Sequence, residues 1–173
     1  SGNTTITVNQ LGILTSTNGT AWNFTPIFIG VSKGGGEVFN DYANNTAVGN
    51  NSHAEGLQTN AKADNSHAEG QLTNASGVNS HAEGQETEAV GVNSHAEGFQ
   101  THANKNNSHA EGRVTVADGV ASHAEGGETQ ASGDYSHAEG QKTVAIGSSS
   151  HTEGYNTKAK NSNSHAEGNS TVA

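Results

Sequence analysis

The residues most capable of binding or acid–base chemistry are a histidine and a glutamate that recur together along most of the chain. The pentapeptide Ser-His-Ala-Glu-Gly occurs nine times at intervals of fourteen residues, beginning at Ser52, Ser66, Ser80, Ser94, Ser108, Ser122, Ser136, Ser150 and Ser164. Thr152 replaces the alanine in one copy. Imidazole and carboxylate groups can form ion pairs, bind transition metals or transfer protons. Which of these applies depends on how the repeat folds.

Catalysis is the least favoured of these chemistries. Serine, histidine and glutamate superficially suggest a nucleophile, a base and an acid, but neighbouring residues on a strand point to opposite faces. The sequence contains no His-Glu-x-x-His zinc motif, no phosphate-binding loop and no dinucleotide fingerprint. His102 lies at a variable position and is expected to be a surface residue. We therefore expect a protein that is not an enzyme.

The repeat predicts an all-β solenoid. With the serine as position 1, position 5 is always Gly, position 8 always Thr and position 10 always Ala, while position 12 is Gly except at Ala63, Lys105 and Asn161. Small residues at positions 1 and 3, and again at 8 and 10, indicate two short strands whose small faces point inward. The glycines suit turns or close backbone approaches. Stacked coils of fourteen residues would form a parallel β-solenoid with strands ~4.8 Å apart. A coiled coil is disfavoured because apolar heptad positions are lacking.

Three regions are expected along the chain. Residues 1–37 lie outside the repeat and read as a small N-terminal β segment, with a strand pair from Ile6 to Leu14, a turn at Asn18-Gly19 and a further strand through Ile27, Ile29 and Val31. Residues 38–51 read as a degenerate capping repeat. Counting back from Ser52 places Phe39 at the histidine position and Asp41 at the glutamate position. Residues 52–173 form the repeat array, with eight full repeats and one truncated repeat.

Composition and charge exclude several classes of partner. Only 29% of the residues are hydrophobic, so the interior must be thin, and the exact phase of the repeat argues against disorder. The formal charge of −10, with ten histidines counted as neutral, is unsuited to binding nucleic acid. No apolar run is long enough for membrane insertion. The absence of cysteine excludes disulfides.

The histidines and glutamates are expected to face outward, because positions 2 and 4 alternate with the inward serine and alanine. Free surface positions in this repeat vary, yet these two do not, so another molecule is expected against this face, and a second copy of the chain is the simplest candidate. The residues concerned are His53, Glu55, His67, Glu69, His81, Glu83, His95, Glu97, His109, Glu111, His123, Glu125, His137, Glu139, His151, Glu153, His165 and Glu167.

Residues 38–173 resemble the fourteen-residue head repeat of trimeric autotransporter adhesins, Ser-Val-Ala-Ile-Gly-x-x-Ser-x-Ala-x-Gly-x-x. The Ser, Ala, Gly, Thr/Ser, Ala and Gly positions correspond. The resemblance implies a left-handed β-roll that assembles as a homotrimer around a threefold axis, with His53, Glu55 and every later pair facing that axis and Phe39 and Asp41 capping it. The Ser-His-Ala-Glu-Gly form, preceded by a segment like Val38-Phe39-Asn40-Asp41-Tyr42, also resembles repeat regions of prophage tail-fibre proteins.

Three roles remain open for the His–Glu face. In the first, charged His–Glu pairs hold the trimer together, with the pKa of histidine raised and that of glutamate lowered by the partner. In the second, both side chains line a hydrated, idle groove. In the third, rings of three histidines on the threefold axis bind a divalent transition metal, with the glutamates orienting the rings. Cohesion needs no cofactor in the first two.

The resemblance implies a non-enzymatic fibre or stalk. A phage or prophage tail that attaches to a host surface is the first expectation, and the head of a bacterial trimeric surface adhesin is the second. A metal-binding His/Glu solenoid is the alternative of a different class. The expected partners are two further copies of the chain and a host cell-surface receptor or glycan. The expected location is a virion tail, or the outside of a bacterial cell.

Overall fold

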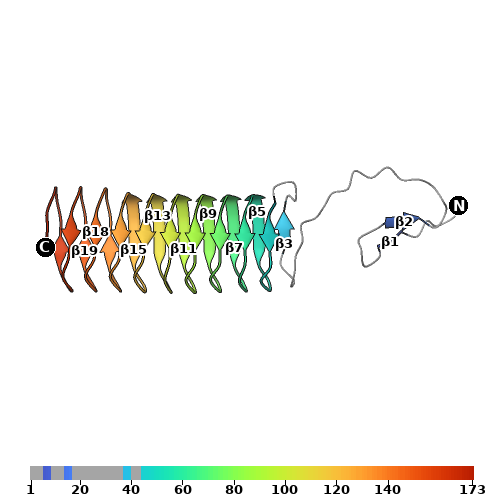
Figure 1. The fold of residues 1–173 in the computed structure, drawn as a ribbon, viewed down its shortest axis with the longest axis horizontal. Helices are drawn as coiled ribbons and strands as arrows, with labels where there is room; N and C mark the ends of the chain where they lie inside the picture. Colours follow the sequence, from blue (N-terminus) through green and yellow to red (C-terminus); the bar gives the residue numbers. More distant parts are fainter. Residues whose placement is uncertain (1–5, 9–13, 17–36, 40–43) are drawn as a thin grey trace.

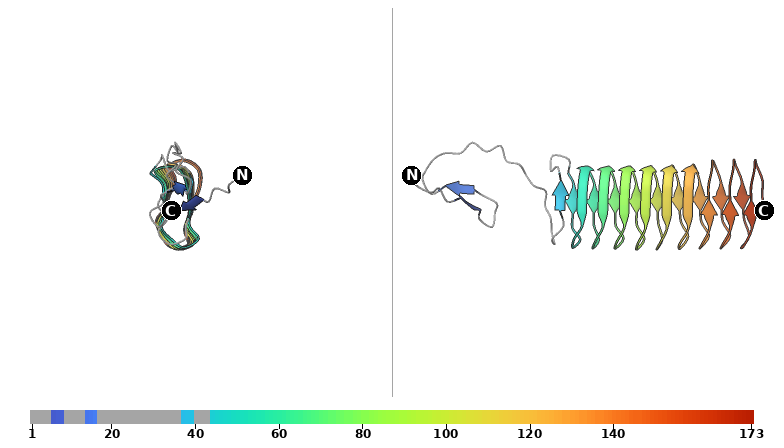
Figure 2. Two further views of the ribbon diagram at one scale, coloured as in Figure 1. Left: turned by 90° about the vertical axis from the view of Figure 1, so that its right-hand side faces the viewer. Right: turned by 180° about the vertical axis from the view of Figure 1, so that it is seen from behind.

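The chain folds into a parallel β-solenoid, as the repeat predicted. The computed structural model describes residues 6–8, 14–16, 37–39 and 44–173, and for the first three ranges only the backbone. Every regular element within these ranges is a strand. Successive coils stack along one axis to form a rod, and the end-on view shows that their outlines superimpose (Figures 1 and 2).

Two parallel sheets run along the rod. The sheet that carries the histidines contains ten strands: β3 (Glu37–Phe39), β5 (His53–Leu57), β7 (His67–Gln71), β9 (His81–Gln85), β11 (His95–Phe99), β13 (His109–Arg113), β15 (His123–Gly127), β17 (His137–Ala138), β19 (His151–Thr152) and β21 (His165–Ala166). We call it the His–Glu sheet. Its strands pair in sequence order, each with the equivalent strand of the next coil.

The second sheet contains nine shorter strands: β4 (Thr46–Ala47), β6 (Asn60–Ala61), β8 (Asn74–Ala75), β10 (Glu88–Ala89), β12 (His102–Ala103), β14 (Val116–Ala117), β16 (Gln130–Ala131), β18 (Val144–Ala145) and β20 (Lys158–Ala159). Its pairing has the same register, so that Ala89 lies beside Ala75 and Ala103. Within the array, every residue therefore lies on its own counterpart in the neighbouring coil.

The interior is a narrow column of alanine, threonine and serine. In the complete coils, the alanines at positions 3 and 10 and the threonines at position 8 are fully buried, and no larger side chain is fully buried in the described residues. Such small side chains let the two sheets approach closely, and each buried methyl group contributes only about 0.8 kcal/mol. The backbone hydrogen bonds between coils therefore carry much of the cohesion.

The invariant serine closes a turn. The hydroxyl of Ser52 donates to the backbone carbonyl of Gly49 at 2.7 Å, and Ser136 makes the same bond to Gly133 at 2.6 Å. The bond recurs in most coils and satisfies a side chain that is only 2% exposed in each of these two cases. Serine at position 1 is therefore explained by the geometry of the turn that precedes it.

Glycine is required at positions 5 and 12 of the repeat for different reasons. Gly98, at position 5, has a φ of 111°, which non-glycine residues rarely adopt. Gly91, at position 12, does not have a positive φ, but a Cβ there would lie 1.9 Å from the carbonyl oxygen of Lys105 in the next coil. The first glycine is needed for conformation and the second for close approach.

Two non-glycine positions in each coil also adopt the left-handed conformation, which the sequence did not reveal. Position 7 has φ values from 53° to 59°, and position 14 from 52° to 59° over the complete repeats. Five asparagines at position 14 join their side-chain amides in a ladder with spacings of 3.0–3.3 Å, at Asn51, Asn65, Asn79, Asn93 and Asn107. Asparagine tolerates this conformation well, but Val114 at position 7 does not.

The N-terminal region agrees with the sequence in part. Strand β1 (Ile6–Val8) pairs antiparallel with β2 (Leu14–Ser16), as expected for a strand pair. The expected turn at Asn18-Gly19 and the strand through Ile27, Ile29 and Val31 lie outside the described residues.

Replacing Gly98 with alanine is expected to destabilise the rod by ~2 kcal/mol or more, because the new Cβ would meet the carbonyl oxygen of Gly112 at 2.1 Å in a strained backbone conformation. Gly127→Ala is the matched control, since its nearest neighbour would be Gln141 Cγ at 3.8 Å. Chemical denaturation followed by circular dichroism measures both. Equal midpoints for the two variants would contradict this account.

Replacing Val114 with asparagine is expected to stabilise the rod by about 1 kcal/mol, because a β-branched side chain is disfavoured at its φ of 58°. Val116→Asn is the control: Val116 is also half-buried but lies in strand β14, where valine is favoured. Thermal melting of both variants decides the matter, and a loss of stability in Val114→Asn would argue against strain at this position.

Candidate functional site: the histidine–glutamate face

The nine histidines and nine glutamates form two columns on the outer side of the His–Glu sheet. In strand β9, the buried Ala82 lies between His81 and Glu83, both of which are partly exposed. Parallel pairing in register places His81 beside His67 and His95, and Glu83 beside Glu69 and Glu97. The structure therefore brings together all the predicted pairs from His53–Glu55 to His165–Glu167.

The imidazole rings stack on one another along the rod. From His67 to His165, neighbouring ring centroids lie 4.6–4.9 Å apart with interplanar angles of 1–15°. Only His53 departs, with its ring at 81° to that of His67. The spacing of the strands sets the spacing of the rings, since each ring extends from the same position of its strand.

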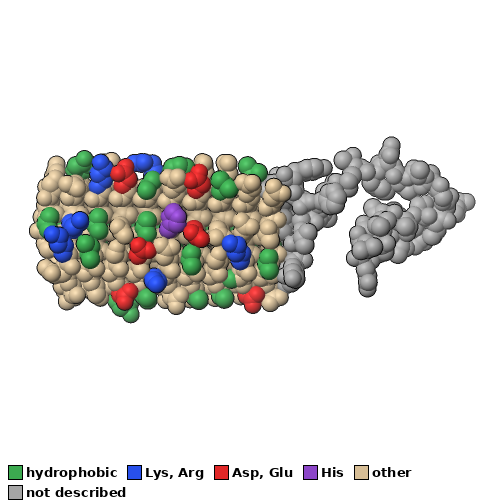
Figure 3. Space-filling view, in the orientation of Figure 1, with side chains coloured by type: hydrophobic (Ala, Val, Ile, Leu, Met, Phe, Trp, Pro, Cys, Tyr) green, Lys and Arg blue, Asp and Glu red, His purple; other side chains and the backbone are tan. Residues whose placement is uncertain are grey.

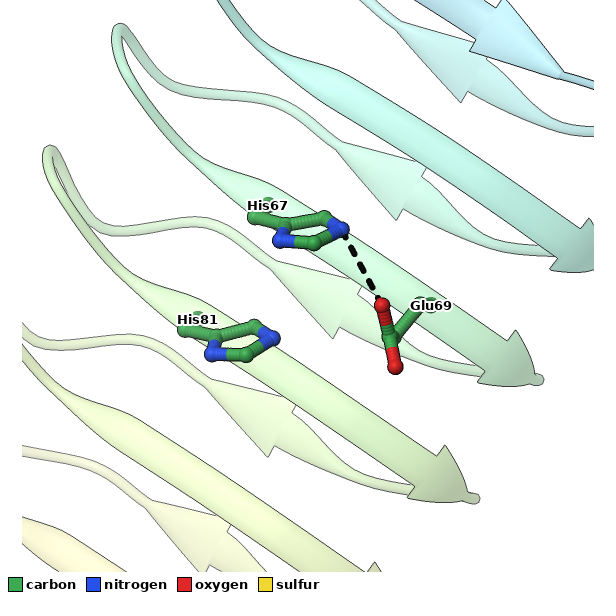
Figure 4. Close-up of side chains that lie close together, drawn as sticks. All are labelled: His67, Glu69 and His81. Atoms are coloured by element: carbon green, nitrogen blue, oxygen red, sulfur yellow. Dashed lines mark ion pairs between the residues drawn. The ribbon is translucent and has the colours of Figure 1, made fainter.

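Each histidine faces the glutamate of its own coil. The Nε2–Oε2 distance is 3.1 Å in the pair His53–Glu55, 3.3 Å in His67–Glu69 and 3.9 Å in His151–Glu153. Figure 4 shows His67 directed at Glu69, with the ring of His81 parallel to it. Most pairs are thus close enough for electrostatic attraction but too long for a strong hydrogen bond.

Seven of the histidines have a buried Nε2 atom that makes no hydrogen bond within the described part of the chain: His67, His81, His95, His109, His123, His137 and His151. The histidine and glutamate side chains of these coils are nevertheless about one-third exposed. A buried donor or acceptor without a partner lowers stability. The single chain therefore presents a polar face whose hydrogen-bonding capacity is incompletely used.

The surroundings of the histidines favour the neutral imidazole. Burial lowers the pKa of His81, His109, His123 and His137 below the ordinary value of 6.5, and the charge of neighbouring histidines lowers it further. The glutamates act in the opposite direction but do not compensate. In the single chain, burial and the neighbouring histidines therefore outweigh the carboxylates at these four residues. The predicted rise of the histidine pKa concerns His–Glu pairs formed between chains and stays a prediction.

Two neighbouring glutamates of the column have pKa values shifted in opposite directions. Burial raises the pKa of Glu125 to about 7, and hydrogen bonding with Glu139 and Glu111 raises it as well. Hydrogen bonding with Glu125 lowers the pKa of Glu139. A proton on Glu125 therefore reduces the repulsion between this carboxyl group and the ionised Glu139. The predicted lowering of the glutamate pKa by an imidazole of another chain stays a prediction.

Metal binding would need a different arrangement of neighbouring rings. His67, Glu69 and His81 offer ligand atoms within 4.8 Å of one another, and similar groups recur along the column. Two nitrogens bound to one tetrahedral zinc ion lie only ~3.4 Å apart, and their lone pairs must converge on the ion. The rings of His67 and His81 are parallel to within 5°, so their lone pairs do not converge. A shared ion would therefore have to draw on different chains or rotate the rings.

The serines do not join the histidines in a catalytic arrangement. Ser94 is 2% exposed, and its hydroxyl donates to the carbonyl of Gly91 on the interior side, whereas His95 lies on the outer face. The same separation holds in the other complete coils. The arrangement of the described residues thus does not pair a serine nucleophile with a histidine base.

The cap predicted at Phe39 and Asp41 is out of register. Phe39 pairs with Glu55 and Glu37 with His53, so Phe39 occupies the glutamate position and Glu37 the histidine position. Thr46 nevertheless pairs with Asn60, as a regular repeat requires. Two additional residues therefore lie between Phe39 and Thr46, which counting back in steps of fourteen could not detect. Asp41 lies outside the described residues.

The face opposite the histidine column has no comparable order. Figure 3 shows apolar, basic and acidic side chains scattered over one side of the rod, and the histidine row is not on this side. His102, which the sequence assigned to the surface, is half-buried in strand β12 of the second sheet. Among the described residues, the regular columns of ionisable side chains therefore lie on the His–Glu face.

Position 6 is a feature whose importance the repeat consensus concealed. It lies two residues after each glutamate, near the end of the longer strands, and carries Leu57, Phe99 and Tyr155 in three coils but small or polar residues in the others. Leu57 is 43% and Tyr155 44% exposed, and Phe99 is half-buried. Comparing the variable columns separately, rather than only the invariant ones, would have identified these residues.

No protein-family model matches the chain, and no curated protein matches its sequence. Within the described ranges, the chain contains no helical segment with the length and hydropathy needed to cross a bilayer.

In the single-chain state, acid is expected to remove the stability that the histidines contribute. The stability contributed by the lowered pKa of His81, His109, His123 and His137 is present above pH 6.5 and is lost as the pH falls through their folded values. The contribution of Glu125 has the opposite sign, being present below pH 4.5 and lost as the pH rises through about 7. Removing two histidines isolates their share, so the Tm of the double variant His109→Gln/His123→Gln minus that of the wild type should increase as the pH falls from about 7 to about 5.

Melting curves recorded where light scattering gives the mass of one chain measure this difference. It arises because the double variant lacks two of the four imidazoles that acid protonates. A difference in Tm that stays constant or shrinks on acidification would contradict the neutral imidazole column.

Proposed function

We propose that this chain is a non-enzymatic structural unit of a homotrimeric fibre, in which the His–Glu faces of three copies meet at the axis. The observation that carries the proposal is a face of partly exposed, invariant histidines and glutamates in which the buried histidine Nε2 atoms of seven coils lack hydrogen-bond partners. A free surface gives no reason for both residue types to recur unchanged in nine coils.

A second copy fits this face because the face is complementary to itself. Each coil presents an imidazole beside a carboxylate, so a neighbouring chain can offer a carboxylate to an unused imidazole and accept one in return. The thin alanine interior also favours association, since a single rod buries little apolar surface. Three copies, rather than two, follow from the resemblance of the repeat to trimeric adhesin heads.

Within this proposal, a phage or prophage tail fibre that attaches to a host surface is the first role, and a bacterial surface adhesin the second. A rigid rod with parallel stacked coils suits a stalk that holds a receptor-binding or glycan-binding part away from its base. Both roles place the protein in a virion tail or outside a bacterial cell.

Glu97→Lys is expected to break the trimer, because it would place three lysines among the histidines of one axial layer. Glu88→Lys is the matched control: it makes the same charge change on strand β10 of the second sheet. Light scattering at about 20 µM should give a trimeric mass for the wild type and for Glu88→Lys, and at least a tenfold weaker assembly for Glu97→Lys. A monomeric wild type, or a trimer unaffected by Glu97→Lys, would contradict the proposal.

Chelation separates this role from the metal-binding alternative. If hydrogen bonds between imidazoles and carboxylates hold the chains together, EDTA should leave the trimeric mass and Tm unchanged. Dissociation on chelation, together with a stoichiometric transition metal found by elemental analysis, would favour the metal-binding solenoid.

A further inference from the structure

The His–Glu face by itself cannot define how three rods align along their axis. This point rests on the proposed trimer. Neighbouring coils present the same histidine and glutamate at a spacing of 4.6–4.9 Å between rings. Sliding one chain by one coil therefore re-pairs eight of its nine layers with equivalent layers, and only one layer loses its partners. Register must come from residues that break the repeat.

Three coils break the repeat in the same way. Position 6 carries Leu57, Phe99 and Tyr155, and the remaining coils have Gln71, Gln85, Arg113, Gly127, Gln141 and Asn169 there. Backbone pairing confirms that these residues form one column, because Gln85 pairs with Phe99, and Phe99 with Arg113. The column begins immediately after the glycine that follows each glutamate, so it lies along the border of the His–Glu face.

The same three coils differ at a second position. They are the coils in which position 12 is not glycine but Ala63, Lys105 and Asn161. In the glycine coils, a Cβ at position 12 would lie 1.9–2.1 Å from a backbone oxygen of the next coil. The three coils thus share two features: an apolar side chain at position 6, and a residue other than glycine at position 12. This coincidence marks them as a distinct class of coil rather than as random exceptions.

The spacing of this class is unequal. Leu57 and Phe99 are 42 residues or three coils apart, and Phe99 and Tyr155 are 56 residues or four coils apart. The separations of three, four and seven coils are all different. When one chain slides along another by any number of coils, no more than one apolar residue can therefore meet a counterpart. All three meet only when the chains are in register.

We propose that Leu57, Phe99 and Tyr155 are the contacts that fix the axial register of three copies of this chain. In the aligned trimer, each apolar side chain meets its own counterparts and is removed from water. In a shifted trimer, the same side chains lie against glutamine, arginine or glycine and remain hydrated. The repeated His–Glu layers then hold the chains together, and the three unequally spaced apolar residues align them.

The test uses the full chain with one spin label. The chain has no cysteine, so Val90→Cys, at an exposed position, accepts a nitroxide without competing thiols. Light scattering first establishes the mass, and pulsed dipolar spectroscopy then measures the distances between labels. In the aligned trimer, equivalent labels lie at one height and give a single narrow distance.

Two variants remove the proposed alignment. Leu57→Gln/Phe99→Gln/Tyr155→Gln places at all three positions the residue that Gln71, Gln85 and Gln141 already provide, and should add longer distances from shifted chains. Gln141→Tyr/Tyr155→Gln keeps the composition but makes both separations three coils. It should add a population displaced by about 14 Å along the axis. Leu72→Gln/Val92→Gln/Ile146→Gln, which removes three exposed apolar residues elsewhere, should keep the single distance.

The outcomes separate the two proposals. A wild-type chain with the mass of a monomer overturns the trimer and this inference with it. A trimer in which the first two variants keep the single narrow distance overturns the register assignment alone. New distances in the Leu72→Gln/Val92→Gln/Ile146→Gln control overturn it as well, because register would then depend on apolar surface in general.

Discussion

The structure depends on stacking each residue directly on its own counterpart in the next coil. Parallel pairing in register, with strands ~4.8 Å apart, allows no larger interior than alanine, threonine and serine at the buried positions. It also brings backbones so close at position 12 that a Cβ on Gly91 would overlap the carbonyl of Lys105. The same constraint therefore determines the core, the glycines and the order of the surface columns.

Stacking like on like has an electrostatic consequence. A column of ionised glutamates, or of protonated histidines, would repel itself along its whole length. Burial favours the neutral imidazole at His81, His109, His123 and His137, and it raises the pKa of Glu125, so both columns carry less charge than their composition suggests. Neutral imidazoles can still donate and accept hydrogen bonds, which suits the contact between copies that we propose.

Repetition and its interruptions have separate physical roles in this account. Identical layers multiply a weak contact, but they make every alignment nearly equivalent. Residues that differ from the repeat and occur at unequal intervals remove that equivalence without changing the contacts between layers. Examples are Leu57, Phe99 and Tyr155. The degenerate first coil is a further interruption, since two additional residues between Phe39 and Thr46 end the regular phase.

The sequence by itself determined the all-β solenoid, the fourteen-residue coil, the inward serine, alanine and threonine, and the outward His–Glu columns, because a strict period and alternation of two leave few other arrangements. Only the tertiary structure decided the pKa directions, since these depend on which groups stack on each ring. It also decided the left-handed backbone at positions 7 and 14, where residues as different as Val114 and Asn156 occupy one conformation. The register of Phe39 likewise became known only from the pairing of strands β3 and β5. An insertion inside a degenerate coil cannot be located from the sequence, because no repeat residues define the expected spacing there.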